Sequence, residues 1–214
     1  MVSGVRKTVF LLVAVIAVVL GATTYKYSQK KLLSEEQLKS AGAIIFETPR
    51  SFKFEGLVKH NSKLLTKDDF KGRWSLIYFG YTFCPDICPT SLAKINNMDK
   101  QLKKEMPELA ERMGYMMVTV DPKRDSVDKL KHYLPYFNPY FIGVTGDIKN
   151  IYDLTRQFNI AFTPVINTED EFYLVDHSAN LVIINPQGDY HGFIRPPFDP
   201  EKLSLVMASV NKLF

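Results

Sequence analysis

Cysteine is scarce in this chain of 214 residues, which contains only Cys84 and Cys88. Two cysteines cannot build the several disulfide bridges of a small secreted scaffold, and they cannot form a four-cysteine metal site. Repeats and low-complexity tracts are also absent. Hydrophobic residues make up 46% of the chain and charged residues 23%, and this balance excludes an intrinsically disordered protein.

Acidic residues are absent from the first 31 positions, where the basic residues are Arg6, Lys7, Lys26, Lys30 and Lys31. The whole chain has 27 basic and 23 acidic residues and a formal charge of +4. Removing these five positive charges leaves 22 basic residues against 23 acidic ones, a charge of −1 for the body. A domain that binds nucleic acid needs a basic face of its own. We therefore expect no nucleic-acid partner.

Residues 8–25 form an uncharged run between Lys7 and Lys26. A helix of about 18 apolar residues is just long enough to cross a bilayer. We therefore predict that residues 1–31 are an N-terminal membrane anchor with basic flanks and contain one transmembrane helix. Residues 32–50 are predicted to be a tether, and residues 51–214 the folded domain. A cleaved signal peptide, with a basic start and an apolar middle, is the alternative.

The orientation of this segment rests on conflicting signals. Basic residues flank both sides, and their count alone places the C-terminal side in the cytoplasm. A short cationic N-terminus before one apolar segment is, however, typical of an export signal, and a cysteine pair suits an oxidising compartment. We predict a single-pass protein of the bacterial inner membrane with its domain in the periplasm. The mitochondrial inner membrane, with the domain facing the intermembrane space, is the alternative.

Apolar runs and helical periodicities alternate along the body. The strands are predicted at residues 52–54, 74–80, 115–120, 140–145, 173–175, 181–185 and 190–194. Helices are predicted at residues 89–105, 126–134, 147–158 and 200–213, and residues 161–171 are expected to be irregular. This order predicts an α/β fold with a mixed central sheet flanked by helices. A cysteine pair directly after the first long strand is typical of the thioredoxin-like fold.

The two cysteines are separated by three residues, and Pro89 follows them at the predicted start of a helix. This places Cys88 at the N-cap, where unpaired amide groups lower the pKa of a thiol. Two soft thiolates without a carboxylate cluster favour Cu(I) and leave a position for a third ligand. Inert buried thiols, a structural disulfide and a thiol–disulfide redox pair are the alternatives.

Four histidines are candidates for the third ligand. His177 immediately precedes the strand predicted at residues 181–185, and in a thioredoxin-like sheet the loop entering that strand faces the cysteine turn. An ordinary hydrogen-bonded loop histidine is the alternative for this residue. His60 is expected in a polar loop, His132 on a helix surface, and His191 on a strand facing solvent.

Three motifs, in this order, resemble those of the Sco/SenC copper proteins. They are residues 78–89 around the cysteines, Val-Thr-Val-Asp-Pro-Lys-Arg-Asp at 118–125, and Val-Asp-His-Ser at 175–178. The likeness covers residues 44–214 and includes a single N-terminal anchor. It implies a thioredoxin-like fold and a copper ion held by Cys84, Cys88 and His177. For residues 121–125 a turn followed by a helix cap is an equally good interpretation.

The resemblance also implies a function, which is assembly of the binuclear copper (CuA) site in subunit II of cytochrome c oxidase. The leading hypothesis is a membrane-anchored copper metallochaperone whose copper donor the sequence does not reveal. The alternative is a thiol–disulfide reductase that keeps the cysteines of subunit II reduced, with Cys84 and Cys88 as its redox pair. A redox or copper sensor is a third possibility.

Overall fold

The structure is a computed structural model that describes residues 2–28, 32–163 and 172–214; for residues 2, 3, 5–8 and 22–28 it describes the backbone alone. The chain divides into two compact units, Met1–Leu32 and Leu33–Phe214. Each unit is described by itself.

The first unit contains one helix, α1 (Val2–Ser28). The large apolar side chains described in it, from Val9 to Leu20, are exposed. Within the described residues, no helix combines the length and the apolar character needed to cross a membrane. This finding does not support the transmembrane helix predicted over residues 8–25.

The second unit is built on a mixed sheet whose strand order is β1-β7-β6-β3-β4-β5-β2. The central strand β3 pairs in parallel with β4 and antiparallel with β6. Among the strands that the structure describes, β4 and β5 form the other parallel pair, and the remaining pairs are antiparallel. The mixed sheet predicted from the sequence is thus confirmed. The strands are β1 (Ala43–Arg50), β2 (Leu57–Lys59), β3 (Trp74–Gly80), β4 (Met113–Thr119), β5 (Ile142–Gly146), β6 (Leu181–Ile184) and β7 (Tyr190–Ile194).

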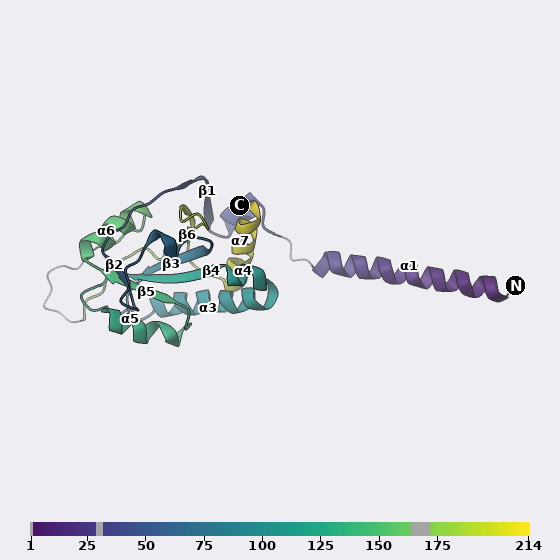
Figure 1. Ribbon diagram of the computed structural model, residues 1–214, viewed down its shortest axis with the longest axis horizontal. Coiled ribbons are helices and arrows are strands. Elements are labelled where there is room, and N and C mark those ends of the chain that lie inside the picture. The colour runs from purple at the N-terminus through teal and green to yellow at the C-terminus, as the bar shows by residue number, and fades with distance from the viewer. Residues whose placement is uncertain (1, 29–31, 164–171) are drawn as a thin grey trace. The chain divides into compact units, whose positions relative to one another are not determined.

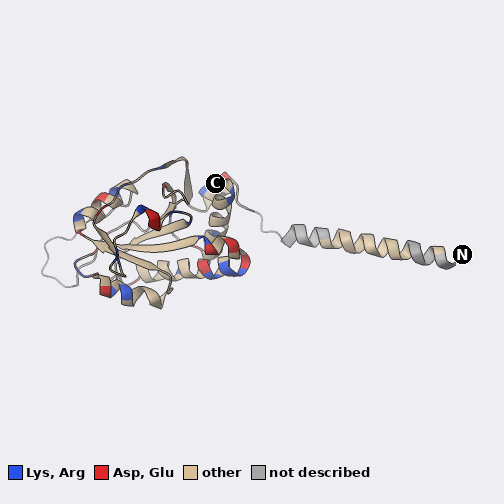
Figure 2. Ribbon diagram, in the orientation of Figure 1, with Lys and Arg blue, Asp and Glu red and all other residues tan. Residues whose placement is uncertain are grey.

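Helices cover the sheet, with α6 above the strands and α3 and α5 below them in the view of Figure 1. The helices are α2 (Glu35–Ser40), α3 (Ile87–Glu105), α4 (Pro107–Glu111), α5 (Val127–Tyr133), α6 (Ile148–Gln157) and α7 (Pro200–Leu213), with 3₁₀ helices η1 (Lys67–Asp69) and η2 (Leu134–Tyr136). The caps predicted at Ser126 and Asp147 are confirmed, because each side chain accepts a backbone N–H of the first turn. Figure 2 shows Lys and Arg interspersed with Asp and Glu on the helices, while the strands carry almost no charge.

The core lies on both faces of β3, all seven residues of which are buried. Continuous burial is expected of a central strand covered by helices on two sides, and it explains the unbroken apolar run in the sequence. The strand delivers Gly80, and the loop that follows it, to one end of the sheet.

The predicted tether over residues 32–50 is wrong. Residues 35–40 form α2, and residues 43–50 form edge strand β1, which pairs antiparallel with β7. A capping box at Ser34 starts α2, and Leu38 is buried. The polar residues of this segment lie mostly on α2, in which only Leu38 is buried.

Two predicted strands are not formed. At residues 52–54 the backbone of Lys53 bonds to the side-chain amide of Gln157, with both distances 2.8 Å, in place of a neighbouring strand. At residues 173–175 there is no strand, but His177, just beyond, forms an isolated bridge with Phe162. Most of the segment predicted to be irregular, residues 164–171, lies outside the described residues.

Candidate metal centre

The cysteines lie between β3 and α3, in the turn that the sequence predicts. The helix begins at Ile87 with Asp86 as its N-cap, so Cys88 lies inside the first turn and the predicted N-cap position is wrong. Pro89 is tolerated there because the first backbone N–H groups of a helix have no intrahelical acceptor. Both thiols are free; Cys84 is half-buried and Cys88 is buried.

The helix start directs an amide at one sulfur, as the sequence argument requires. The backbone N–H of Cys88 donates to Sγ of Cys84 over 3.4 Å. For the other sulfur the expectation of easy ionisation is wrong, because burial raises the pKa of the Cys88 thiol to about 12. A buried thiolate at this position therefore needs a nearby positive charge to be stable.

His177 reaches the cysteines across the sheet. Its Nε2 lies 3.6 Å from Sγ of Cys88, although 88 residues separate them in the chain. The imidazole ring packs perpendicular to the rings of Tyr78 and Tyr81, with centroids 6.4 and 6.0 Å away. The spatial relation predicted from the sequence, a distant histidine meeting the cysteine turn, is therefore present.

The protonation of His177 suits a ligand. Its Nδ1 lies 3.2 Å from the carbonyl oxygen of Ser178, and because a carbonyl only accepts, the ring proton is assigned to Nδ1. The lone pair of Nε2 then faces Cys88. Burial lowers the pKa of His177, which keeps the imidazole neutral and able to bind a cation.

The site opens into a cavity of about 260 Å³, whose lining includes Cys84, His177, Ile87 and Leu174. In the part of the chain that the structure describes, no three His, Cys, Asp or Glu side chains are grouped closely enough to hold a metal ion. The ligand set Cys84, Cys88 and His177 therefore stays a prediction. Asp176, which could orient the histidine from behind, is exposed.

The other histidines do not lie at this site. The half-buried His60 accepts the backbone N–H of Gly143 at Nδ1 over 2.9 Å, so its expected solvation is wrong. His191 is also buried, packed against the rings of Trp74 and Phe214, and does not face solvent. His132 is exposed on α5, as predicted.

The loop after β4 does more than form the turn and helix cap considered for residues 121–125. The carboxylate of Asp125, which is fully buried, accepts the backbone N–H and the hydroxyl of Thr82 over 3.0 and 2.6 Å. Thr82 lies two residues before Cys84, so this loop supports the cysteine turn. The helix cap in this region is Ser126, and Asp125 is not part of it. The sequence did carry a signal for this role: Ser126 is sufficient to cap the helix, so the acidic residue directly before it was free to serve another purpose.

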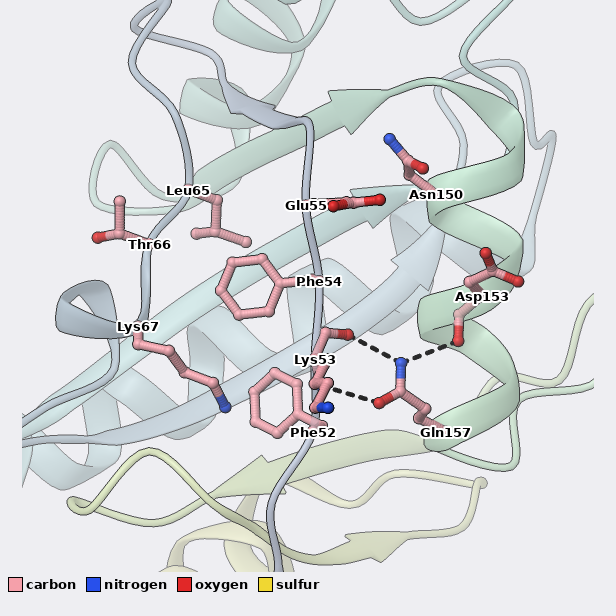
Figure 3. Close-up of a pocket in the computed structure, with 10 residues that line it drawn as sticks. All are labelled: Phe52, Lys53, Phe54, Glu55, Leu65, Thr66, Lys67, Asn150, Asp153 and Gln157. Carbon is pink, nitrogen blue, oxygen red and sulfur yellow. Dashed lines mark hydrogen bonds between the residues drawn. The ribbon is translucent and has the colours of Figure 1, made fainter.

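A second cavity, of about 630 Å³, contains none of the predicted ligands (Figure 3). The rings of Phe52 and Phe54 lie beside Lys67, whose Nζ is 3.5 Å from the centroid of the Phe52 ring. The amide of Gln157 fastens the backbone of Lys53 at its edge (Figure 3). This cavity therefore offers neither a thiol nor an imidazole to a soft cation.

The chain is similar to solved structures of Sco proteins. Arabidopsis thaliana ScoI with copper bound aligns with a TM-score of 0.67 and 28% identity, covering 75% of this chain and 98% of that one. Yeast Sco1 with copper bound aligns with a TM-score of 0.69 and 27% identity, covering 78% and 91%. These likenesses confirm the thioredoxin-like α/β fold.

Sequence comparisons agree. A putative copper-binding protein of Stutzerimonas stutzeri is 34% identical over 173 residues, which cover 81% of this chain and 83% of that protein. The human mitochondrial SCO2 homologue is 37% identical over 139 residues, covering 64% of this chain and 52% of that protein. The chain thus spans about half the length of the human relative. The family model described as SCO1/SenC matches residues 47–212. From the β1 strand to the last helix, the chain belongs to the SCO1/SenC family.

Proposed function

We propose that this protein binds a copper ion through Cys84, Cys88 and His177 and transfers it to another protein. The observation that carries the proposal is the 3.6 Å approach of His177 Nε2 to Cys88 Sγ, with the lone pair of a neutral imidazole facing the sulfur. Thiolate and imidazole ligands together suit copper better than hard cations. Two structural relatives are described as copper-bound, which supports the choice of metal.

The residues present fit this cargo. The soft cation supplies the positive charge that a thiolate at the buried Cys88 position requires, so binding releases the thiol protons. The sulfur of Cys84 lies in the same turn, where it accepts the backbone N–H of Cys88 over 3.4 Å. The adjoining cavity of about 260 Å³ leaves one side of the site open for ligand exchange with a partner.

The recipient that we propose is subunit II of cytochrome c oxidase, during assembly of its CuA site. The support is the family: a relative of known structure is described as a member of the Sco family of cytochrome c oxidase assembly proteins. The half-buried Cys84 and the cavity beside it suit transfer to a partner, because an incoming ligand can approach from that side.

Copper binding is tested on the reduced full-length chain, purified in detergent. The parent is expected to bind one copper ion, with X-ray absorption showing sulfur and imidazole nitrogen ligands. Cys84→Ser, Cys88→Ser and His177→Ala should each abolish stoichiometric binding while the thermal unfolding midpoint stays near the parent value. His132→Ala, which removes an exposed histidine, is the matched control. Parent-like affinity in His177→Ala would contradict the proposed ligand set.

The alternative function is a thiol–disulfide reductase that keeps the cysteines of subunit II reduced. The observation that favours it is the unequal exposure of two free thiols, since the half-buried Cys84 could attack while the buried Cys88 resolves the mixed disulfide. The reductase does not need His177. Oxidase assembly that persists in His177→Ala but fails in either Cys→Ser variant would favour the reductase over the copper carrier.

We propose that the protein is located at the bacterial inner membrane with its second unit in the periplasm; the mitochondrial inner membrane is the alternative. The support is the sequence of residues 8–25, an uncharged run with basic flanks. Fusion of alkaline phosphatase after Phe214 should give an active enzyme in a bacterial host. Inactive fusions, or full release of the chain by carbonate washing, would contradict this location.

A further inference from the structure

Two segments carry the predicted ligands: the cysteine turn, residues 81–86 with Cys88 just beyond it, and the histidine segment, residues 173–178. The loop that follows β4, residues 121–125, contacts both of them, and we call it the bridging loop. Its last residue, Asp125, holds the cysteine side. One carboxylate oxygen accepts the hydroxyl of Thr82 over 2.6 Å, and the other accepts the Thr82 backbone N–H over 3.0 Å. The bridging loop thus fixes the turn two residues ahead of Cys84.

Asp121 and Arg124 of the bridging loop bind the histidine segment. The Asp121 carboxylate accepts a hydrogen bond from the hydroxyl of Tyr173 over 2.6 Å, and another from the Nε–H of Arg124. Nη2 of Arg124 in turn donates to the carbonyl oxygen of Tyr173 over 3.0 Å. Tyr173 lies four residues before His177, so side chain and backbone of the histidine segment are both fastened to the bridging loop.

Arg124 is the residue on which both segments converge. Its guanidinium carbon lies 3.5 Å from the ring centroid of Tyr173, 4.7 Å from that of Phe83 and 5.7 Å from that of Tyr81. Phe83 and Tyr81 belong to the cysteine turn. The same Tyr81 hydroxyl accepts the backbone N–H of Val175 over 3.3 Å. One planar cation therefore lies among aromatic rings of both segments.

Residues 81–86 and 173–176 are neither helix nor strand. Outside the bridging loop, the backbone around His177 is held by a short bridge, in which Thr163 N–H donates to the Asp176 carbonyl over 3.1 Å and Ser178 N–H donates to the Ala161 carbonyl over 2.8 Å. A bridge this short is not a strand ladder, so contacts of side chains add to the ordering of the segment.

The Arg124 and Asp121 side chains are only 12% and 3% exposed. A pair so poorly exposed is retained at a desolvation cost, which a surface turn would not require. Lysine could replace the charge of Arg124 but neither its planar stacking nor its fork of donors.

We propose that Arg124 is a positioning residue that holds the histidine segment against the cysteine turn. Through it, His177 Nε2 stays within reach of the ion that Cys88 binds. The copper part of this inference rests on the proposed function. The ordering of residues 173–178 does not, because it is a property of the metal-free chain.

The first measurement is amide hydrogen exchange by NMR on the reduced, metal-free full-length chain. Arg124→Lys should accelerate exchange at Val175 and Ser178 by about tenfold or more, while Ile77 in the central strand keeps the parent rate. Lys129→Gln is the matched control, because Lys129 Nζ lies 4.9 Å from the Phe83 ring and makes no described contact with Tyr173. Parent-like exchange at Val175 and Ser178 in Arg124→Lys would overturn the proposal, whether or not copper binds.

A milder variant guards against failure to fold. Tyr173→Phe keeps the ring beneath Arg124 and removes only the hydroxyl bonded to Asp121. It should accelerate the same two amides by a smaller factor, about threefold, with an unchanged unfolding midpoint. Equal acceleration at Ile77 in either variant would indicate general destabilisation and contradict positioning.

The second measurement is copper affinity, determined by competition with a chelator. Changes in groups that orient a metal ligand typically weaken binding by about 10- to 100-fold, and Arg124→Lys should fall in that range. Lys129→Gln, the control of the exchange experiment, should bind copper as tightly as the parent. An unchanged affinity in Arg124→Lys despite faster exchange, or an equal loss in Lys129→Gln, would overturn the proposal. If the parent itself binds no copper, the proposed function fails and hydrogen exchange alone decides the ordering role.

Discussion

At the scale of single residues, the position of Cys88 depends on a glycine, because Gly80 has no side chain and leaves room for the sulfur. Gly80 lies at the end of β3, directly beneath the cysteine turn. A Cβ atom built there would lie 2.7 Å from Cε1 of Tyr78 and 3.1 Å from Sγ of Cys88. The glycine therefore lets the aromatic ring and the sulfur approach the strand together, and it sets the depth at which the sulfur is buried.

Gly80→Ala should consequently disturb the site without unfolding the sheet. The added methyl group overpacks a tight contact, which typically costs about 1–3 kcal/mol. We expect the free energy of unfolding, measured in urea, to fall by that amount, and the proposed copper affinity to fall with it because Cys88 must shift.

Gly114→Ala provides the matched control for this change. Position 114 is also a strand glycine, but its nearest neighbours are the Cδ of Arg73 at 3.2 Å and the Oγ of Ser75 at 3.4 Å, both on side chains that can move. Equal effects at the two positions would show that the Cys88 contact has no special role.

At the scale of elements, the sheet gains an edge strand from a segment whose composition resembles a linker. β1 lies against β7, with Ile45 opposite Gly192 and Ile44 opposite Phe193. The close approach again depends on glycine, since a Cβ at position 192 would lie 2.2 Å from the carbonyl oxygen of Ile44. Here the obstructing atom belongs to the backbone and cannot rotate away.

Gly192→Ala therefore tests whether residues 43–50 pair with the sheet. If they do, the clash must push β1 away from β7, and we expect a loss of about 3 kcal/mol or more in the free energy of unfolding. If these residues were a free tether, the substitution would cost no more than Gly114→Ala. Chemical denaturation of the two variants beside the parent distinguishes these results.

At the scale of the whole molecule, burial affects three histidines that lie far apart in the chain in the same direction. It lowers the pKa of His60, of His177 and of His191, and Lys131 lowers that of His60 further. Each group binds a proton more weakly in the folded chain than in the unfolded one. Between the two pKa values the unfolded chain therefore holds more protons, and acid favours unfolding.

The contribution that these three histidines make to the stability of the metal-free protein should accordingly be fully present above the ordinary histidine pKa of about 6.5. It should be lost as the pH drops below that value. His60→Gln should lose less stability than the parent between pH 7.5 and pH 5.5, since one of the three groups no longer titrates. Urea unfolding at both pH values measures the difference, and His132→Gln, at an exposed position, should behave like the parent. A parent whose stability rises on acidification would contradict this account.

Much of this architecture follows from local sequence. The run at residues 74–80 is apolar throughout because a strand covered on both faces must be, and the bounds of β3 and α7 match the prediction. Ser126 and Asp147 start their helices by bonding the first free amides, which are only a few residues away. Such signals are readable because the interacting groups are neighbours in the chain.

Only the tertiary structure decided which groups meet across long separations. The edge strand β1 exists because β7 offers it hydrogen bonds, and Lys53 remains outside any strand because Gln157 occupies its backbone groups. The thiol pair and its spacing were evident from the sequence, but the high pKa of Cys88 arises from what packs over it. The role of Arg124 was likewise invisible, because the rings that surround it come from segments about 40 and 50 residues away in either direction. Local chemistry selects the elements, whereas burial and long-range contact determine how each reactive group behaves.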